Sequence, residues 1–239
     1  MTWCIAGHGK VASALAQRLT ERGVAFEQVS ARGWANGKDL PSAGCRALFL
    51  ALPDDVLSEA AVCLGTASPS YPVFHCSGAT PLSALEALPL SGVWYPMQSF
   101  RSSDVPWGRF RIFWENEALE STLQAWHQAL GIDTLGEWAS SQQRGAYHLG
   151  AVWANNFPNH LVALFQAYQA KTGVSGLESM LAETVQAALN GDAKTLQTGP
   201  ALRGDQATLD RHLQELPEEF RDLYLALSES IHRFHASQS

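Results

Sequence analysis

Short apolar runs and stretches of helical periodicity alternate along the first 135 residues. The apolar runs predict strands at residues 2–6, 25–29, 46–52, 72–75, 92–95 and 109–114. Apolar positions that recur every three to four residues predict helices at 10–21, 56–63, 81–88 and 117–130. Strands that alternate with helices are typical of an α/β fold with an open, doubly wound, largely parallel sheet.

The pattern changes near residue 140. No later run predicts a strand, and the periodicity indicates helices at 141–172, at 176–190, from about Asp205, and at 218–236. We therefore expect an α/β domain over residues 1–135 and an all-α domain over residues 136–239. Pro158 inside the first of these helices predicts a kink or a local break that frees carbonyl groups near Ala154.

A glycine-bearing turn joins the first predicted strand to the first predicted helix. Gly7, Gly9 and Ala12 have the spacing of the G-x-G-x-x-G/A fingerprint of dinucleotide-binding folds. The first position allows the tight turn, the second lets a pyrophosphate approach the backbone, and the third permits close helix–strand packing. The helix N-terminus then faces the phosphates. We expect this Rossmann-type loop to bind cofactor through Gly7, His8, Gly9, Lys10, Val11 and Ala12.

The end of the second predicted strand indicates which dinucleotide binds. NAD-binding folds place an acidic residue about 20 residues beyond the glycines to hold the ribose 2′-hydroxyl. This chain has Ser30 and Arg32 there instead, and a hydroxyl with a guanidinium suits a 2′-phosphate. The pattern favours NADP, although by itself Arg32 also fits a solvated loop arginine.

Ligands of open α/β sheets bind outside the carboxyl ends of the strands. The third strand ends at Leu52 and Pro53, and the fourth is followed by a loop that would line a nicotinamide pocket. The fifth strand is followed by Gln98, which we expect to contact substrate. The cofactor contacts expected at the third and fourth strand ends are Leu52, Pro53, His75, Ser77 and Gly78.

The long predicted helix carries polar residues on one stripe. At 100° per residue, His148, Val152, Asn155 and Asn159 lie within about 60° of each other. We expect His148, Asn155 and Asn159 to be catalytic, with His148 able to exchange a proton near neutral pH. The stripe equally fits side chains that cap backbone groups or bridge helices at a dimer contact.

Two further polar residues are candidates for substrate binding. Asn156 follows the stripe, and Arg203 lies in a turn rich in helix breakers, where its guanidinium could hold a carboxylate or phosphate. An intramolecular salt bridge explains Arg203 as well. Asp205 in the same turn predicts a helix N-cap.

Composition excludes several classes of protein. A net charge of −7 without a basic run argues against nucleic-acid binding, and no apolar stretch reaches the length of a membrane span. The N-terminus enters a strand directly, and the four cysteines form no C-x-x-C pair, which favours a reduced cytoplasmic protein. No histidine spacing favours a metal. Only 16% of residues are charged and eight are tryptophan, so we expect apolar surface hidden in a subunit interface.

Six motifs together resemble the Rossmann-like NADP oxidoreductases that carry a C-terminal helical domain of unknown function. This group belongs to the superfamily of 6-phosphogluconate dehydrogenase and pyrroline-carboxylate reductase. The resemblance implies a homodimer in which the helical domains interlock. The motifs are Gly7-x-Gly9-x-x-Ala12 and residues 50–55 (LALPDD), 75–78 (HCSG), 95–100 (YPMQSF), 155–160 (NNFPNH) and 198–205 (TGPALRGD).

The chain departs from related proteins at two positions. Tyr95 replaces the histidine that related strand ends often carry, and His148 and Val152 precede Asn155 where hydroxyacid dehydrogenases have a lysine. The sequence therefore predicts an NADP-dependent oxidoreductase that transfers a hydride between the nicotinamide and a small carbonyl or imine. The missing lysine also fits a non-catalytic NADP-binding sensor or interaction protein, and a deazaflavin-dependent oxidoreductase is a further alternative.

Overall fold

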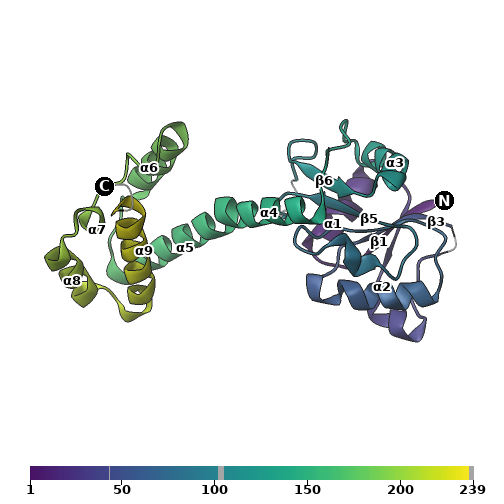
Figure 1. Ribbon diagram of the computed structural model, residues 1–239, viewed down its shortest axis with the longest axis horizontal. Coiled ribbons are helices and arrows are strands. Elements are labelled where there is room, and N and C mark those ends of the chain that lie inside the picture. The colour runs from purple at the N-terminus through teal and green to yellow at the C-terminus, as the bar shows by residue number, and fades with distance from the viewer. Residues whose placement is uncertain (43, 102–104, 237–239) are drawn as a thin grey trace. The chain divides into compact units, whose positions relative to one another are not determined.

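The computed structural model describes residues 1–42, 44–101 and 105–236. The chain divides into two compact units, Met1–Pro158 and Asn159–Ser239, and each is described by itself (Figure 1). The first unit therefore continues beyond residue 135, the expected end of the α/β domain. The expected domain boundary between residues 135 and 136 stays a prediction.

The described residues of the first unit form a seven-stranded sheet of order β2-β1-β3-β4-β5-β6-β7. Neighbours from β2 to β5 are parallel, β6 runs antiparallel to β5, and β7 is parallel to β6. The expected Rossmann-type, largely parallel sheet is thus confirmed. The strands are β1 (Thr2–Ala6), β2 (Phe26–Val29), β3 (Cys45–Leu50), β4 (Val73–His75), β5 (Ser91–Pro96), β6 (Ile112–Glu115) and β7 (Glu137–Trp138).

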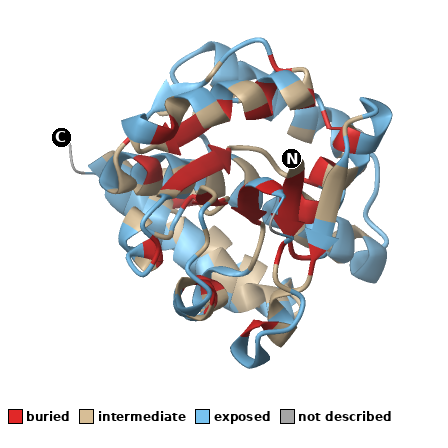
Figure 2. Ribbon diagram, turned by 90° about the vertical axis from the view of Figure 1, so that its right-hand side faces the viewer, coloured by how far each residue is buried: buried red, intermediate tan, exposed pale blue. Residues whose placement is uncertain are grey.

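Helices cover both faces of this sheet. On one face α1 (Lys10–Glu21) and α3 (Glu120–Leu130) pack on an aromatic cluster of Trp3, Phe49, Trp94 and Trp126. The rings of Phe49 and Trp126 stack with centroids 3.9 Å apart. On the other face α2 (Leu57–Thr66) packs on a second, mainly aliphatic cluster. Figure 2 shows the buried residues concentrated in the strands and in the helix faces turned toward them. Because both faces are covered, the inner parallel strand β3 is nearly continuously apolar.

Three predictions of secondary structure are wrong in detail. The helix expected at 81–88 is a single 3-10 helix, η3 (Leu82–Leu85), held by i→i+3 bonds such as Ala84 N–H to Pro81 O at 3.1 Å. Pro89 explains this, because a proline disfavours helical geometry in the residue before it. The strand expected at 109–114 begins only at Ile112, and the two-residue strand β7 was not predicted.

Three further 3-10 helices connect the main elements in the described residues. They are η1 (Ala31–Asn36), η2 (Asp54–Val56) and η4 (Glu117–Leu119). The turn after Pro53, which contains Asp54 and Asp55, is one of these 3-10 helices and leads directly into α2. The polar loop after η1 includes residue 43, which lies outside the described residues.

A capping box starts the helix that follows β7. The Ser140 side chain accepts from the Gln143 N–H while the Gln143 side chain accepts from the Ser140 N–H, and α4 (Ser141–Ala151) begins there. A π-helix, η5 (Val152–Asn156), separates α4 from α5 (Phe157–Thr172). The Phe157 N–H bonds to the Val152 carbonyl, five residues back. The local break predicted at Pro158 thus takes the form of a π-turn, which adds a residue to one turn and changes the 100° spacing beyond Val152.

The second unit consists of helices in its described residues. After α5 come α6 (Glu178–Asn190), α7 (Pro200–Arg203), α8 (Gln206–Glu215) and α9 (Glu218–Ala236). The N-cap predicted at Asp205 is confirmed, since its carboxylate accepts from the Thr208 N–H at 3.1 Å. Ala201 is the only buried residue between 159 and 236.

Candidate cofactor site and active site

The glycine loop after β1 requires glycine at its first position. Gly7 has φ +114°, and a Cβ there would lie 2.4 Å from the Ala51 carbonyl oxygen. The Gly7 N–H bonds to the Val29 carbonyl at 3.0 Å, and its carbonyl accepts from the Gln28 side chain at 2.7 Å. The turn is therefore held between β2 and β3. The close helix–strand packing predicted at Ala12 is present, because its side chain is fully buried.

The N-terminus of α1 lacks a side chain that caps it. Gly9 is the N-cap residue, no side chain accepts from the first-turn N–H groups, and the first turn holds no acidic residue. A Cβ on Gly9 would meet nothing within 4 Å. The exposed N–H groups of a 12-residue helix favour an anion at this position, and the absent methyl leaves space for one.

A cavity of about 720 Å³ lies over this loop. Seven residues predicted to bind cofactor line it together, while Lys10, Val11 and Ala12 are not among its lining residues. Glu59, Ala60 and Cys63 of α2 also line the cavity and were not predicted from the sequence. The seven predicted lining residues are Gly7, His8, Gly9, Ser30, Arg32, Leu52 and Pro53.

Ser30 and Arg32 lie at the end of β2, on the wall of this cavity. The Ser30 hydroxyl accepts from the Arg32 N–H at 3.4 Å and caps η1. Arg32 is exposed, and no described residue accepts a hydrogen bond from its guanidinium. A cation and a hydroxyl thus border the cavity where the sequence led us to expect a 2′-phosphate.

The loop after β4 is organised by its own side chains. The His75 ring is fully buried, and its Nδ1 accepts from the Ser77 N–H at 3.2 Å. Burial, together with the positive charge of Arg144, lowers the pKa of His75 to about 4, so this histidine is neutral. The Ser77 hydroxyl accepts from the N–H groups of Ala79 and Thr80 at 3.1 and 2.9 Å. His75 and Ser77 therefore shape the loop, and neither lines the cavity.

Gly78 brings this loop against two polar side chains. A Cβ on Gly78 would lie 2.6 Å from Cζ of Tyr95 and 2.7 Å from Nδ1 of His148. The Tyr95 hydroxyl lies 3.2 Å from that same Nδ1. Tyr95 is buried and His148 is half-buried. Only a residue without a side chain fits between the loop and this pair, which accounts for the glycine.

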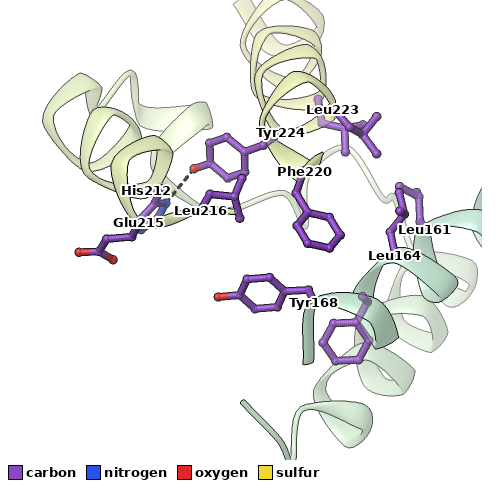
Figure 3. A pocket seen from close by; sticks show the side chains of 11 residues that line it. Leu161, Leu164, Tyr168, His212, Glu215, Leu216, Phe220, Leu223 and Tyr224 are labelled. Atoms are coloured by element: carbon purple, nitrogen blue, oxygen red, sulfur yellow. Dashed lines mark hydrogen bonds between the residues drawn. The ribbon is translucent and has the colours of Figure 1, made fainter. Parts of the chain in front are cut away.

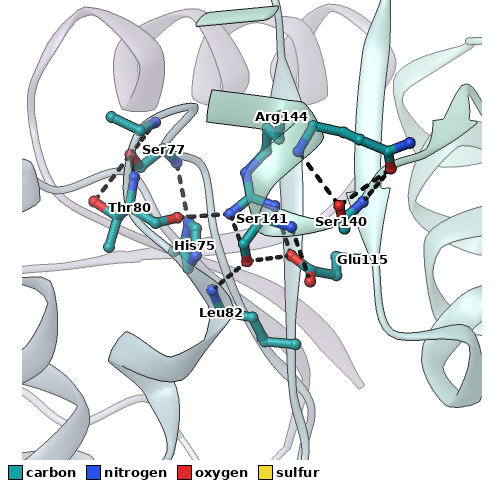
Figure 4. Close-up of polar contacts among 10 residues, drawn as sticks. His75, Ser77, Thr80, Leu82, Glu115, Ser140, Ser141 and Arg144 are labelled. Carbon is teal, nitrogen blue, oxygen red and sulfur yellow. Dashed lines mark hydrogen bonds and ion pairs between the residues drawn. The ribbon is translucent and has the colours of Figure 1, made fainter. Parts of the chain in front are cut away.

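A buried ion pair between Arg144 and Glu115 fixes the start of α4 (Figure 4). The Arg144 side chain is fully buried, and its Nη1 lies 2.6 Å from Oε2 of Glu115 on β6. Its Nη2 donates to the Thr80 carbonyl at 2.6 Å, which ties α4 to the loop after β4. Ser141 donates to Glu115 at 2.8 Å and accepts from the Leu82 N–H at 3.0 Å. Arg144 precedes His148 by one helical turn, so the network sets where His148 lies.

Polar residues from the loop after β5 approach the π-helix. The guanidinium of Arg101 donates to Oδ1 of Asn155, and Nδ2 of Asn155 lies 3.3 Å from Oδ1 of Asn156. Gln98 is half-buried, and its Oε1 accepts from the Ser99 N–H at 2.7 Å. The structure thus places Asn155 against a cation that the sequence pattern did not indicate, and Asn156 beside Asn155.

The remaining predicted residues lie in the second unit. Asn159 lies in the first turn of α5, and Arg203 is the last residue of α7. Both side chains are exposed. Their roles stay predictions.

Three residues of this site were given no role from the sequence. Tyr95, Arg101 and Arg144 make contacts with residues 53, 54 and 29 positions away, respectively. A weak signal existed for each: Tyr95 is the first residue of the motif at 95–100, Arg101 follows that motif directly, and Arg144 lies four residues before His148. Spacing along the chain does not reveal which partners they meet.

The described residues show neither a metal site nor a membrane span. They contain no cluster in which three or more side chains drawn from His, Cys, Asp or Glu could hold a metal ion. None of their helices combines the length and the apolar character needed to cross a membrane.

Comparisons with known proteins cover both parts of the chain. Residues 115–231 match a family model described as a domain of unknown function, DUF2520. Curated protein sequences give no match. Among solved structures, the "putative NADP oxidoreductase BF3122" from Bacteroides fragilis is 25% identical over 97% of this chain and 98% of its own, with a TM-score of 0.78.

More distant structures share the fold at lower identity. An imine reductase from Myxococcus stipitatus, solved with NADP+, is 12% identical over 99% of this chain and 93% of its own, with a TM-score of 0.61. Pyrroline carboxylate reductase from Plasmodium falciparum, solved with NADP, is 12% identical over 100% and 98%, with a TM-score of 0.51. These findings confirm the resemblance to Rossmann-like NADP oxidoreductases that carry a helical C-terminal domain of unknown function.

Proposed function

We propose that this protein is an NADP-dependent oxidoreductase that acts on a small carbonyl or imine. The proposal rests on one observation, that a cavity and a pair of polar side chains lie at the same edge of the sheet. The cavity over the glycine loop lies at the carboxyl ends of β1, β2 and β3, and the Tyr95–His148 pair lies at those of β4 and β5. A dinucleotide is long enough to span neighbouring strand ends, which is where ligands of such sheets bind.

The residues of the cavity fit the phosphates of NADP. The uncapped N-terminus of α1 would hold the pyrophosphate, with Gly9 leaving space for it. Ser30 and Arg32 would hold the 2′-phosphate through charge-assisted hydrogen bonds. The cofactors named with several solved structures of this fold, NADP+ and NADPH, support the same assignment.

The polar groups beyond the cavity fit a proton-transfer role. Bound NADPH would supply a hydride to the carbon of a C=O or C=N bond. His148 would hold and donate a proton to the heteroatom, and Asn155 and Gln98 would orient the substrate. His75 is unsuited to this work, because its buried ring stays neutral and its Nδ1 is already bonded to the loop.

Cofactor binding and turnover are tested separately. Calorimetry with NADPH and NADH measures affinity, and absorbance at the reduced nicotinamide band measures turnover of a panel of carbonyls and imines. We expect tighter binding of NADPH and turnover of at least one class, with loss of turnover in His148→Ala. NADPH binding without turnover of any panel member would favour the non-catalytic sensor, and failure to bind either nucleotide would contradict the proposal.

We further propose that the second unit pairs with a second copy of this chain. Ala201 is its only buried residue in the described part, whereas Met180, Val185 and Leu189 of α6 are 50 to 77% exposed. An apolar groove of about 420 Å³ lies between α5, α8 and α9 (Figure 3). A set of helices with so little interior needs another surface to cover its apolar face. Sedimentation analysis should give the mass of a dimer, and a monomer at micromolar concentration would contradict this proposal.

A further inference from the structure

The Tyr95–His148 pair has a defined direction of hydrogen bonding. The Tyr95 ring is buried against Phe113, and His148 is the only described residue that bonds to its hydroxyl. A buried phenol needs an acceptor for its proton, and Nδ1 of His148 lies 3.2 Å away. A ring nitrogen that accepts a hydrogen bond carries no proton, so neutral His148 has its proton on Nε2.

The opposite ring nitrogen is left for another partner. No described residue bonds to Nε2 of His148, and the ring is only half-buried. Gly78 closes off the Nδ1 side, because even a methyl group there would lie 2.7 Å from that atom. The ring therefore presents Nε2–H, and not Nδ1, to an incoming molecule.

We propose that Tyr95 and His148 form a proton relay that serves the reduced substrate, an inference that rests on the proposed reductase function. As the carbon of the C=O or C=N bond gains a hydride from the reduced nicotinamide, its heteroatom takes the proton from Nε2 of His148. Nδ1 takes the phenolic proton in the same step, so the imidazole stays neutral and Tyr95 becomes a phenolate. Water later returns one proton through His148 to Tyr95, which balances the cycle.

The surroundings of Tyr95 keep the phenol protonated at rest and make a phenolate short-lived. Burial raises the pKa of the phenol to about 12, while the positive charge of Arg144 acts to lower it. Arg144 is fully buried one turn before His148, where water screens its charge little and its ion pair with Glu115 at 2.6 Å offsets part of it. An alkoxide or amide anion is a stronger base than a phenolate, so the transfer runs toward the product.

The hydrogen bond is tested in the protein without cofactor. The ¹⁵N shifts of His148, assigned by their loss in His148→Gln, report which ring nitrogen carries the proton. We expect the Nε2–H tautomer in the native protein and a mixture of tautomers in Tyr95→Phe. Tyr147→Phe is the matched control, because Tyr147 adjoins His148 on α4 but its hydroxyl bonds to Arg111. A native Nδ1–H tautomer, or an unchanged tautomer in Tyr95→Phe, would overturn the relay.

Catalysis is tested next with the loaded protein. We expect Tyr95→Phe to lower single-turnover reduction about 100-fold, with unchanged NADPH affinity and unfolding temperature, while Tyr147→Phe keeps the native rate. If the native protein reduces a substrate and Tyr95→Phe reduces it at the same rate, the relay is overturned and the proposed function stands. Absence of turnover by the native protein overturns the proposed function, and the relay with it, even where the tautomer is as expected.

Discussion

The two units of this chain bury their apolar residues to very different extents. The sheet of the first unit has two clusters of fully buried side chains, one on each face. The second unit has similar helix-forming sequence but buries one residue, Ala201, in its described part. Burial of apolar area is the main favourable term in folding. The first unit therefore carries its own stability, whereas we expect that of the second to depend on another chain.

This contrast separates two kinds of information in the sequence. A local pattern decides that a segment is helical, whereas the extent of burial depends on what covers it. The amphipathic helices of both units have the same kind of pattern, and only the first finds a partner surface within its own unit. Mutations that act on internal contacts should therefore affect the first unit most, and mutations of exposed apolar residues should affect the second.

The largest expected effect comes from the ion pair buried in the first unit. Arg144→Met leaves Glu115 without its cation, and we expect a loss of about 3–5 kcal/mol in the free energy of unfolding. Arg111→Met is the matched control, because its pair with Glu137 has the same 2.6 Å length but is exposed, and should cost less than about 1 kcal/mol. Urea unfolding measures both, and equal losses would refute the role of burial.

The second effect depends on pH and on His75. Its pKa is lowered to about 4 in the folded state, so the unfolded chain binds the proton more readily. Stability should then fall as pH drops from about 6.5 to 4, by about 3 kcal/mol from this residue. Burial also lowers the pKa of His127, which adds to the fall. Unfolding curves measured across this range give the free energy of unfolding at each pH. That free energy should depend less steeply on pH in His75→Gln than in the native protein, and an unchanged dependence would count against this account.

Two glycines of the same loop allow a role in folding to be distinguished from a role in cofactor binding. Gly7→Ala forces a methyl group toward the Ala51 carbonyl at positive φ, and we expect a loss of about 2–3 kcal/mol in stability. Gly9→Ala meets no protein atom, so stability should change by less than about 0.5 kcal/mol. NADPH affinity should nevertheless fall in Gly9→Ala. Retained affinity there would mean that the phosphates do not lie over Gly9.

An exposed apolar residue on each unit tests the proposed dimer. Leu189→Glu on α6 should raise the dimer dissociation constant at least about tenfold. Val62→Glu on α2 alters a residue that is 59% exposed in the first unit, and should leave the dimer intact. Sedimentation velocity over a range of concentrations measures both. Equal behaviour of the two variants would show that the dimer does not depend on α6.

The smallest effect concerns the choice of cofactor. Arg32→Ala should weaken NADPH binding about tenfold through loss of charge-assisted hydrogen bonds to the 2′-phosphate. NADH, which has no such phosphate, should bind the variant and the native protein alike. Calorimetry gives both affinities, and parallel losses for the two nucleotides would remove Arg32 from the 2′-phosphate site.

The part of the fold that follows from local pattern was predictable. The turn at Gly7 follows from its place between an apolar run and a helical pattern, and Asp205 follows from the turn before its helix. The segment 81–88 was predicted as a helix because its apolar spacing is helical, but Pro89 limits it to one 3-10 turn. The two-residue strand β7 is exposed and too short for any periodicity.

The site was predictable only in its local pieces. His148 and Gly78 were both selected from the sequence, yet their contact depends on how α4 lies across the ends of β4 and β5. Arg144 fixes that placement through Glu115, which is 29 residues away. Periodicity also missed the π-turn at Val152–Asn156, because an added residue in one turn leaves no mark on hydrophobicity. Contacts between distant elements were thus beyond what spacing reveals.

The aromatic cluster under α1 and α3 has a consequence for spectroscopy. All eight tryptophans of the chain lie at or before Trp153, and Trp3, Trp94 and Trp126 lie together in the core of the first unit. Residues beyond 158 contain none. Tryptophan emission therefore reports on the first unit alone, and far-ultraviolet circular dichroism reports on the helices of both. Two optical signals from the unlabelled protein are enough to follow the melting of each unit separately.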